Sequence, residues 1–238
     1  MISRTRLLAS LAAAGVVAAP ATAMAAPAAD ATSEAVRIAV LLAVLAIIPA
    51  ILISMTSFVR IVIVLAMVRH AFGMPQTPPN AVLTSLALFM TAFVMAPTFS
   101  AINEGALQPF LEGRAGIAEV METGGAPLRE FMLAHTRDSD LEAVYAISNT
   151  PLPNTAEEVD LLKLTPAFML NELRVAFTIG FVVLLPFLLI DLVVASILLS
   201  LGMMMVPPAT ISLPIKVLMF VLIDGWSLVM EGLLGSFG

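Results

Sequence analysis

The chain has 238 residues, of which 60% are hydrophobic and 12% are charged, and its mean hydropathy is +1.04. Soluble domains are roughly 45 to 50% apolar and about 25% charged, so this composition excludes an ordinary soluble domain and indicates a membrane protein. The net charge of −6 argues against a nucleic-acid partner. The absence of cysteine excludes disulfides, thiolate metal sites and a cysteine nucleophile.

The N-terminus carries the pattern of a cleavable signal peptide at residues 1–25. Two basic residues precede an apolar run that is short for a transmembrane helix, and a small-x-small motif follows it. We predict cleavage between Ala25 and Ala26; the alternative is an uncleaved first anchor. A signal peptide places the mature N-terminus, with the short segment 26–35, on the outer face of the membrane.

Residues 36–103 are predicted to form the first helical hairpin. The 22 positions 38–59 are uncharged, and at about 1.5 Å per residue they span about 33 Å, enough for a hydrocarbon core about 30 Å thick. A turn rich in glycine and proline at 73–79 leads to a second apolar helix. Arg69 and His70 lie next to this turn without an acidic residue, which the positive-inside rule associates with the cytoplasmic side.

The segment 104–165 is an acidic insert with four basic and eleven acidic residues, a net charge of −7. It is predicted to face the periplasm and to form short amphipathic helices. Gly124-Gly125 is expected to end the first of these helices, and Pro127 is expected to begin the next. The insert is too small to fold as an independent domain, so we expect it to pack on its neighbours.

The second helical hairpin is predicted over 166–231, beginning at Pro166 and followed by a tail at 232–238. We expect a long helix with a kink near Pro186, a turn at 202–208, and a returning helix that ends near Glu231. The residues predicted to form the turn and hinges are Pro186, Gly202, Pro207, Pro208 and Pro214.

The turn of the second hairpin contains three consecutive methionines, Met203, Met204 and Met205. Methionine side chains deform to fit irregular partners, and non-helical backbone at membrane depth needs protein or a water-filled cavity around it. The pattern therefore fits a soft constriction that lines a passage. Core or lipid-facing apolar residues are the alternative. Copper(I) binding is a weaker one, because three consecutive thioethers cannot all reach one ion.

Six ionisable residues lie in or near the apolar runs, at a cost of about 2.5 to 3.5 kcal/mol each at membrane depth. They are candidates for assembly or gating: Arg60, Glu172, Arg174, Asp191, Lys216 and Asp224. Asp191 and Lys216 lie at similar distances on either side of the methionine turn, which predicts an ion pair. Arg60 and Glu172 could instead snorkel near a helix end, and Glu172 could bond a neighbouring subunit.

No catalytic motif is found, so we do not expect an enzyme, a cofactor or a metal site. The chain lacks a Walker loop and a GxSxG elbow. Its only histidines, His70 and His135, are predicted to lie on opposite sides of the membrane. Asp191 and Asp224 could suggest an intramembrane aspartyl protease, but Asp224 lacks the preceding Gly-x-Gly of such enzymes.

Eight segments carry a resemblance to one family: 55–61 (MTSFVRI), 78–80 (PPN), 150–151 (TP), 172–173 (EL), 176–181 (AFTIGF), 186–192 (PFLLIDL), 202–214 (GMMMVPPATISLP) and 224–226 (DGW). In order and sequence they resemble the FliP family, the membrane subunit P of the flagellar type III protein export gate. The resemblance covers nearly all of the mature chain. It departs at Thr178, where the family often has a longer polar residue, and at Asn171, where serine is frequent.

The resemblance implies a homo-oligomer of several copies that joins the smaller Q and R subunits and other basal-body proteins. In this family the assembly is a closed helical cone in the inner membrane, through which unfolded flagellar proteins leave the cytoplasm. The helices of the assembled cone are lifted toward the periplasm, and the turn 202–208 corresponds to the family's methionine gasket. Phe131 and Tyr145 of the insert are candidates for contacts between subunits.

Three functions remain to be compared. The first is a subunit of a secretion pore, either flagellar or the equivalent subunit of a virulence injectisome; the signal peptide and the acidic insert favour the flagellar form. A secondary transporter should show an inverted repeat, whereas the two hairpins differ in length and in the placement of their charges. A structural scaffold is harder to distinguish, because a protein that nucleates a gate also lines it.

Overall fold

The computed structural model describes residues 38–39, 42–43, 45–74 and 76–238. The predicted signal peptide, its cleavage between Ala25 and Ala26, and the segment 26–35 lie outside the described residues. The chain divides into two compact units, 1–47 and 48–238. The elements described below belong to the second unit.

The second unit is helical, as the sequence predicts, and its described residues contain no β-strand. After a helix that ends at Ser54, the elements are α2 (Phe58–Ala71), α3 (Asn80–Val94), α4 (Ala96–Ile102), the π-helix η1 (Asn103–Leu107), α5 (Gln108–Leu111), α6 (Ile117–Ala134), α7 (Asp138–Ile147), the 3-10 helix η2 (Ala156–Glu158), α8 (Leu161–Ser200), α9 (Pro208–Leu222) and α10 (Gly225–Gly235).

Among the described residues, α8 is the one unbroken helix long and apolar enough to cross a membrane. Three further pairs of helices reach this length together, but each pair is bent: the helix ending at Ser54 against α2 by 61°, α3 against Ala96–Leu111 by 64°, and α9 against α10 by 66°. The chain therefore has up to four spans, if each bent pair counts as one.

The first apolar run is not one continuous helix, because the helix breaks at residues 55–57, just before α2. The hydroxyl of Ser54 donates to the carbonyl of Ala50 at 2.7 Å, and that of Thr56 donates to the carbonyl of Leu52. The Thr56 hydroxyl also accepts from the backbone N–H of Phe58 at 3.3 Å. These side chains compete with the helical ladder, which explains a break that hydropathy alone cannot reveal.

The returning helix of the second hairpin also breaks earlier than predicted. It ends at Leu222, and Asp224 adopts the left-handed conformation with φ of 50° before α10 begins. The next residue is Gly225, which has no Cβ, and the ring of Phe220 occupies the space that a Cβ would need there. The expected end near Glu231 is wrong, because α10 continues to Gly235.

The α8 helix begins one turn before the predicted start at Pro166. Asp160 caps it by accepting a hydrogen bond from the N–H of Leu162 at 3.0 Å, which satisfies an N–H of the first turn. Pro166 and Pro186 both lie inside α8. The sequence correctly predicts a long helix here but places its start too late.

The insert contains one long helix where the sequence predicts two. Gly124 and Gly125 lie inside α6, and both face close neighbours: a Cβ on Gly124 would lie 3.3 Å from Ala106, and one on Gly125 would lie 3.3 Å from Leu161. These glycines therefore allow α6 to pack against η1 and the start of α8, and they do not end the helix. Tertiary contact overrides the local signal of Gly-Gly and Pro127.

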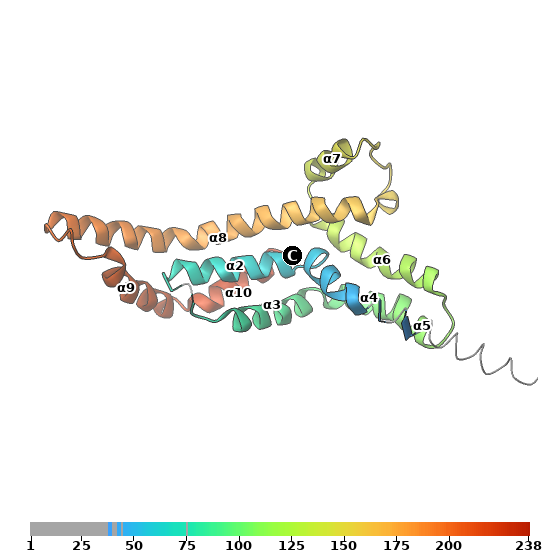
Figure 1. Ribbon diagram of the computed structural model, residues 1–238, viewed down its shortest axis with the longest axis horizontal. Coiled ribbons are helices and arrows are strands. Elements are labelled where there is room, and N and C mark those ends of the chain that lie inside the picture. Colours follow the sequence, from blue (N-terminus) through green and yellow to red (C-terminus); the bar gives the residue numbers. More distant parts are fainter. Residues whose placement is uncertain (1–37, 40–41, 44, 75) are drawn as a thin grey trace, which may run out of the picture. The chain divides into compact units, whose positions relative to one another are not determined.

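The α2 helix lies at the centre of the main hydrophobic core, with α8 along one side and α3 and α10 along the other (Figure 1). Ile61, Val64, Leu65 and Val68 of α2 have no exposed surface. Because helices cover it on both sides, α2 is apolar on nearly all faces and shows little amphipathic pattern in its sequence.

The α2 and α8 helices also pack closely at a glycine, Gly180. A Cβ on Gly180 would lie 3.1 Å from the Cβ of Met67 and would overlap the Met67 sulfur. We therefore expect Gly180→Leu to lower the free energy of unfolding by roughly 1 to 3 kcal/mol through overpacking. Thermal unfolding of the detergent-solubilised chain measures this. Gly232→Leu is the matched control, since nothing lies within 4 Å of a Cβ there.

Candidate functional site

The methionine turn begins where a backbone motif ends α8. Gly202 has a φ of +73°, its N–H donates to the carbonyl of Leu199 at 3.0 Å, and the N–H of Met203 donates to the carbonyl of Leu198 at 2.9 Å. This pair of bonds around a left-handed glycine is a Schellman motif. The N–H of Val206 then donates to the carbonyl of Met203 at 3.3 Å, closing a second turn.

Two prolines then start the returning helix. Pro207 is the N-cap residue of α9 and has an extended backbone. Pro208 is the first residue of α9, where the proline ring costs no hydrogen bond because an N–H at this position has no partner within the helix. Pro214 lies inside α9. The backbone from 201 to 208 is thus held by main-chain hydrogen bonds and proline geometry, and no methionine side chain is needed to form the turn.

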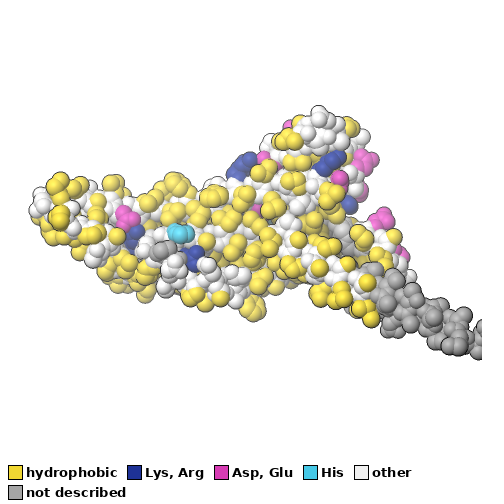
Figure 2. Space-filling view, viewed as in Figure 1, with side chains coloured by type: hydrophobic (Ala, Val, Ile, Leu, Met, Phe, Trp, Pro, Cys, Tyr) yellow, Lys and Arg dark blue, Asp and Glu magenta, His cyan; other side chains and the backbone are white. Residues whose placement is uncertain are grey.

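The three methionine side chains project from this turn into open space. Met203 is 44% exposed, Met204 80% and Met205 96%. No charged residue occurs between Asp191 and Lys216. In Figure 2 hydrophobic side chains cover the end formed by α8 and α9. The turn is therefore the tip of an uncharged hairpin that reaches roughly 15 Å beyond the last ionisable residue, at about 1.5 Å per helical residue.

The predicted ion pair between Asp191 and Lys216 is confirmed. The Nζ of Lys216 lies 2.6 Å from Oδ2 of Asp191, and it also donates to the carbonyl of Ala71 at 3.2 Å. Lys216 is buried and Asp191 is partly exposed. Because Ala71 is the last residue of α2, Lys216 joins α8, α9 and the end of α2 at the base of the uncharged tip.

Arg60 and Glu172 form a second ion pair in the core. Arg60 is 2% exposed and Glu172 is fully buried. Nε of Arg60 donates to Oε2 of Glu172 at 2.9 Å, and its Nη2 donates to Oε1. Snorkelling is therefore wrong for both residues, and Glu172 bonds within its own chain. The pair joins α2 to α8 in the two-pronged geometry that suits a guanidinium and a carboxylate.

The predicted tail 232–238 completes the surroundings of Arg60. Nη1 of Arg60 donates to the carbonyl of Ser236 at 2.6 Å and to its hydroxyl at 3.0 Å. The guanidinium carbon lies 3.9 Å from the ring centre of Phe237. Sequence reasoning missed both residues, because nothing in a short terminal segment indicates that it returns to a buried arginine.

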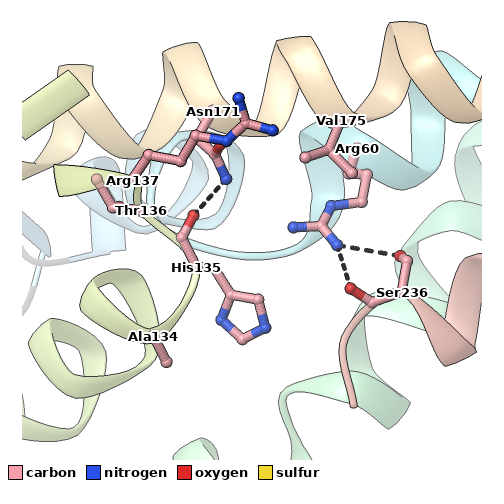
Figure 3. A pocket seen from close by; sticks show the side chains of 8 residues that line it. All are labelled: Arg60, Ala134, His135, Thr136, Arg137, Asn171, Val175 and Ser236. Atoms are coloured by element: carbon pink, nitrogen blue, oxygen red, sulfur yellow. Dashed lines mark hydrogen bonds between the residues drawn. The ribbon is translucent and has the colours of Figure 1, made fainter. Parts of the chain in front are cut away.

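An open hollow of about 230 Å³ lies beside this network, between the end of α6 and the tail (Figure 3). Its lining includes His135, whose Nδ1 lies 2.8 Å from the carbonyl of Phe131. Nδ2 of Asn171 donates to the carbonyl of His135 at 2.7 Å, which fixes the junction of α6 and α7 on α8. In the described part of the chain, no group of three or more His, Asp or Glu residues could hold a metal ion.

The remaining predicted site residues have contacts within the chain. Phe131 packs against Phe168 at a ring distance of 6.0 Å. Tyr145 is buried, its hydroxyl accepts from the N–H of Asp160 at 3.2 Å, and Lys163 lies over its ring. These contacts give both aromatic residues a structural role inside the subunit.

Arg174 holds the insert against α8. Its two terminal nitrogens donate to both carboxylate oxygens of Asp140 on α7, at 2.6 and 2.8 Å. The hydrogen bonds and the charge of Arg174 hold the pKa of Asp140 below its ordinary value of 3.8. Arg174 therefore serves the α7–α8 contact, whereas Asp224 marks the break between α9 and α10.

Comparison with known proteins identifies relatives over most of the chain. The model of the FliP family matches residues 41–233. The flagellar biosynthetic protein FliP of Caulobacter vibrioides is 52% identical over 189 residues, which cover 79% of this chain and 71% of that protein. The flagellar biosynthetic protein FliP of Bacillus subtilis is 49% identical over 189 residues, which cover 79% of this chain and 86% of that protein. The protein of the same name from Aquifex aeolicus is 47% identical over 191 residues, which cover 79% of this chain and 80% of that protein.

Removing one member of the buried pair leaves the other charge without compensation. We expect Arg60→Met to lower the free energy of unfolding by about 3 to 5 kcal/mol, and the double variant with Glu172→Met to recover part of that loss. Thermal unfolding in detergent measures both. Arg114→Met is the control, because its pair with Glu112 is exposed and is worth about 0 to 1 kcal/mol. Equal losses at Arg60 and Arg114 would contradict this assignment.

The lowered pKa of Asp140 sets the pH dependence of the α7–α8 contact. The unfolded state binds this proton more readily, so the contribution to stability is complete above the ordinary pKa of 3.8 and is lost as the pH falls through the folded value. We expect Asp140→Asn to cost roughly 0.5 to 1 kcal/mol at neutral pH. Hydrogen exchange of α7 should show this difference shrinking below pH 3.8, and a difference that persists there would contradict it.

Proposed function

Because the chain belongs to the FliP family, we propose that it is a core membrane subunit of the flagellar type III export gate. Several copies assemble with the smaller Q and R subunits and with other membrane proteins of the basal body in the inner membrane. The assembly is a helical cone that passes unfolded flagellar proteins outward. The relatives support the flagellar form over an injectisome, since they are named flagellar biosynthetic proteins.

The observation that carries this proposal is the exposed methionine turn at the end of an uncharged hairpin. A gate must pass chains of any sequence while it blocks ions, so its seal must be apolar, compliant and indifferent to sequence. Unbranched thioether side chains meet these requirements, because they have three rotatable bonds and no fixed shape. A ring of such side chains excludes ions by excluding water from the constriction.

The backbone of the turn complements these compliant side chains. Main-chain bonds around Gly202 and the following prolines hold its path, so Met203, Met204 and Met205 can move aside for a passing chain while the turn stays folded. No binding pocket for a particular substrate is needed. The energy for transport comes from other components of the apparatus.

The flank of α8 supports assembly in several copies. Large apolar side chains stay exposed along its second half, among them Leu189, Leu192 and Leu199. Lipid covers this surface when the subunit inserts, and the flanks of like subunits cover it afterwards. The buried pairs of Arg60 and Lys216 hold the helices of each subunit together through this change of surroundings. We place the acidic insert in the periplasm and the turn at 73–79 on the cytoplasmic side.

Shortening the three methionines tests the seal directly. We expect replacement of Met203, Met204 and Met205 by alanine to leave assembly intact and to make vesicles that contain the complex leaky to small ions. The reason is that alanine preserves the apolar character and the backbone bonds but removes the volume that closes the constriction. Native mass spectrometry measures the assembly, and an ion-flux assay measures the leak.

Met121→Ala is the matched control, because Met121 is also an exposed methionine but lies on α6, in the insert. It should leave ion permeability unchanged. Wild-type permeability in the triple alanine variant, with assembly intact, would overturn the seal.

A further inference from the structure

The methionines of the described chain differ widely in access to solvent, and those of the turn lie at the exposed end of the range together with Met121 of α6. Met204 and Met205 are the most exposed, and Met203 is about half as exposed. Met90, Met95 and Met132 are 0 to 3% exposed and lie inside the protein. In the single chain, an oxidant dissolved in water therefore reaches the sulfur atoms of the turn but not those of the buried methionines, because thioether oxidation follows exposure.

Oxidation at the turn would change polarity without unfolding the chain. The Schellman motif at Gly202, the bond from the N–H of Val206 to the carbonyl of Met203, and the proline start of α9 all involve backbone atoms. A sulfoxide on a buried methionine, such as Met132, would instead place a polar group in a packed core. Oxidation of the sulfur atoms in the turn therefore leaves the hydrogen bonds that hold the turn in place.

We propose that Met203, Met204 and Met205 form an oxidation site, at which peroxides reversibly convert the thioethers to sulfoxides and thereby open the seal. This inference rests on the proposed function for its effect on permeability. In the reaction the sulfur gives an electron pair to one peroxide oxygen, an S–O bond forms, and the O–O bond breaks. The departing hydroxide takes the proton of the transferred oxygen and becomes water, so the sulfur is oxidised and the peroxide reduced.

The consequence for the seal follows from the change in hydration. A thioether is a weak acceptor of hydrogen bonds, whereas a sulfoxide is polar and binds water. Three consecutive sulfoxides at one tip would bring water into a constriction that blocks ions by being dry. Hydrogen peroxide is close to water in size, so it can enter a mouth too narrow for a folded protein.

The test treats the purified complex with hydrogen peroxide and follows each methionine by peptide mass spectrometry, with ion flux measured in vesicles. We expect Met204 and Met205 to gain oxygen before Met90, Met95 and Met132, and ion permeability to rise in step. The two methionine sulfoxide reductases, MsrA and MsrB, supplied with a dithiol as the electron donor, should reduce the sulfoxides to thioethers, with the oxygen leaving as water and the dithiol becoming a disulfide, and so restore the seal. The triple replacement of 203–205 by leucine should remove the rise in ion permeability that peroxide causes, measured against the same variant before treatment, because leucine has no sulfur to oxidise.

The control variant is Met121→Leu, which removes an exposed methionine outside the turn and should leave the peroxide sensitivity unchanged. If Met90, Met95 and Met132 gain oxygen earlier in the time course than the methionines of the turn, the proposed oxidation site is wrong. Oxidised turns with unchanged permeability, alongside a leaky triple alanine variant, would overturn this inference and leave the proposed function standing. A triple alanine variant that does not leak would overturn the proposed function and the effect on permeability, while the order of oxidation would still decide the site.

Discussion

The buried ion pair between Arg60 and Glu172 is the constraint on which the arrangement of the helices depends. Neither charge is open to water, so each must keep its partner in place, and the partners lie on α2 and α8. Nη1 of Arg60, which does not bond Glu172, donates to Ser236, and the ring of Phe237 lies against the face of the guanidinium. One side chain thus aligns the central helix, the longest helix and the end of the chain.

A second ion pair fixes the same bundle at the base of the methionine hairpin. Lys216 joins Asp191 on α8 to the last carbonyl of α2, so the hairpin is clamped at that level. Next to the clamp, Phe72 packs edge to face against Phe187 and Phe220 at ring distances of 5.4 and 4.6 Å. Beyond these contacts the hairpin carries no charged residue up to its methionine turn.

Whether the sequence predicts each ion pair depends on the length and structure of the chain between its two residues. Asp191 and Lys216 are 25 residues apart with one recognisable turn between them, so their pairing follows from the geometry of a hairpin. Arg60 and Glu172 are 112 residues apart, with the whole insert between them. The sequence identifies both as candidate charges but carries no signal that pairs them, since that contact arises from packing.

The breaks between helices escape prediction for a related reason. Hydropathy detects apolar length and the cost of a charge, but it does not show that the hydroxyl of Thr56 bonds back to the helix or that Asp224 adopts a left-handed conformation, and the chain bends at both points. Gly124 misleads in the opposite direction, because it resembles a helix end but is required for contact with η1. Local hydrogen bonding and backbone conformation decide the breaks, whereas a tertiary contact decides the case of Gly124.

The methionine turn shows why the choice of side chain matters once the backbone is settled. Leucine would supply similar volume at the tip, but its branched carbon restricts its rotamers, so it adapts less well to a passing chain. Methionine gains compliance from its flexible thioether and with it a sulfur that peroxides can oxidise. Met204 and Met205 are exposed on a turn whose bonds are all in the main chain. In the proposed seal, the atom that supplies compliance is therefore also the atom that peroxides would oxidise.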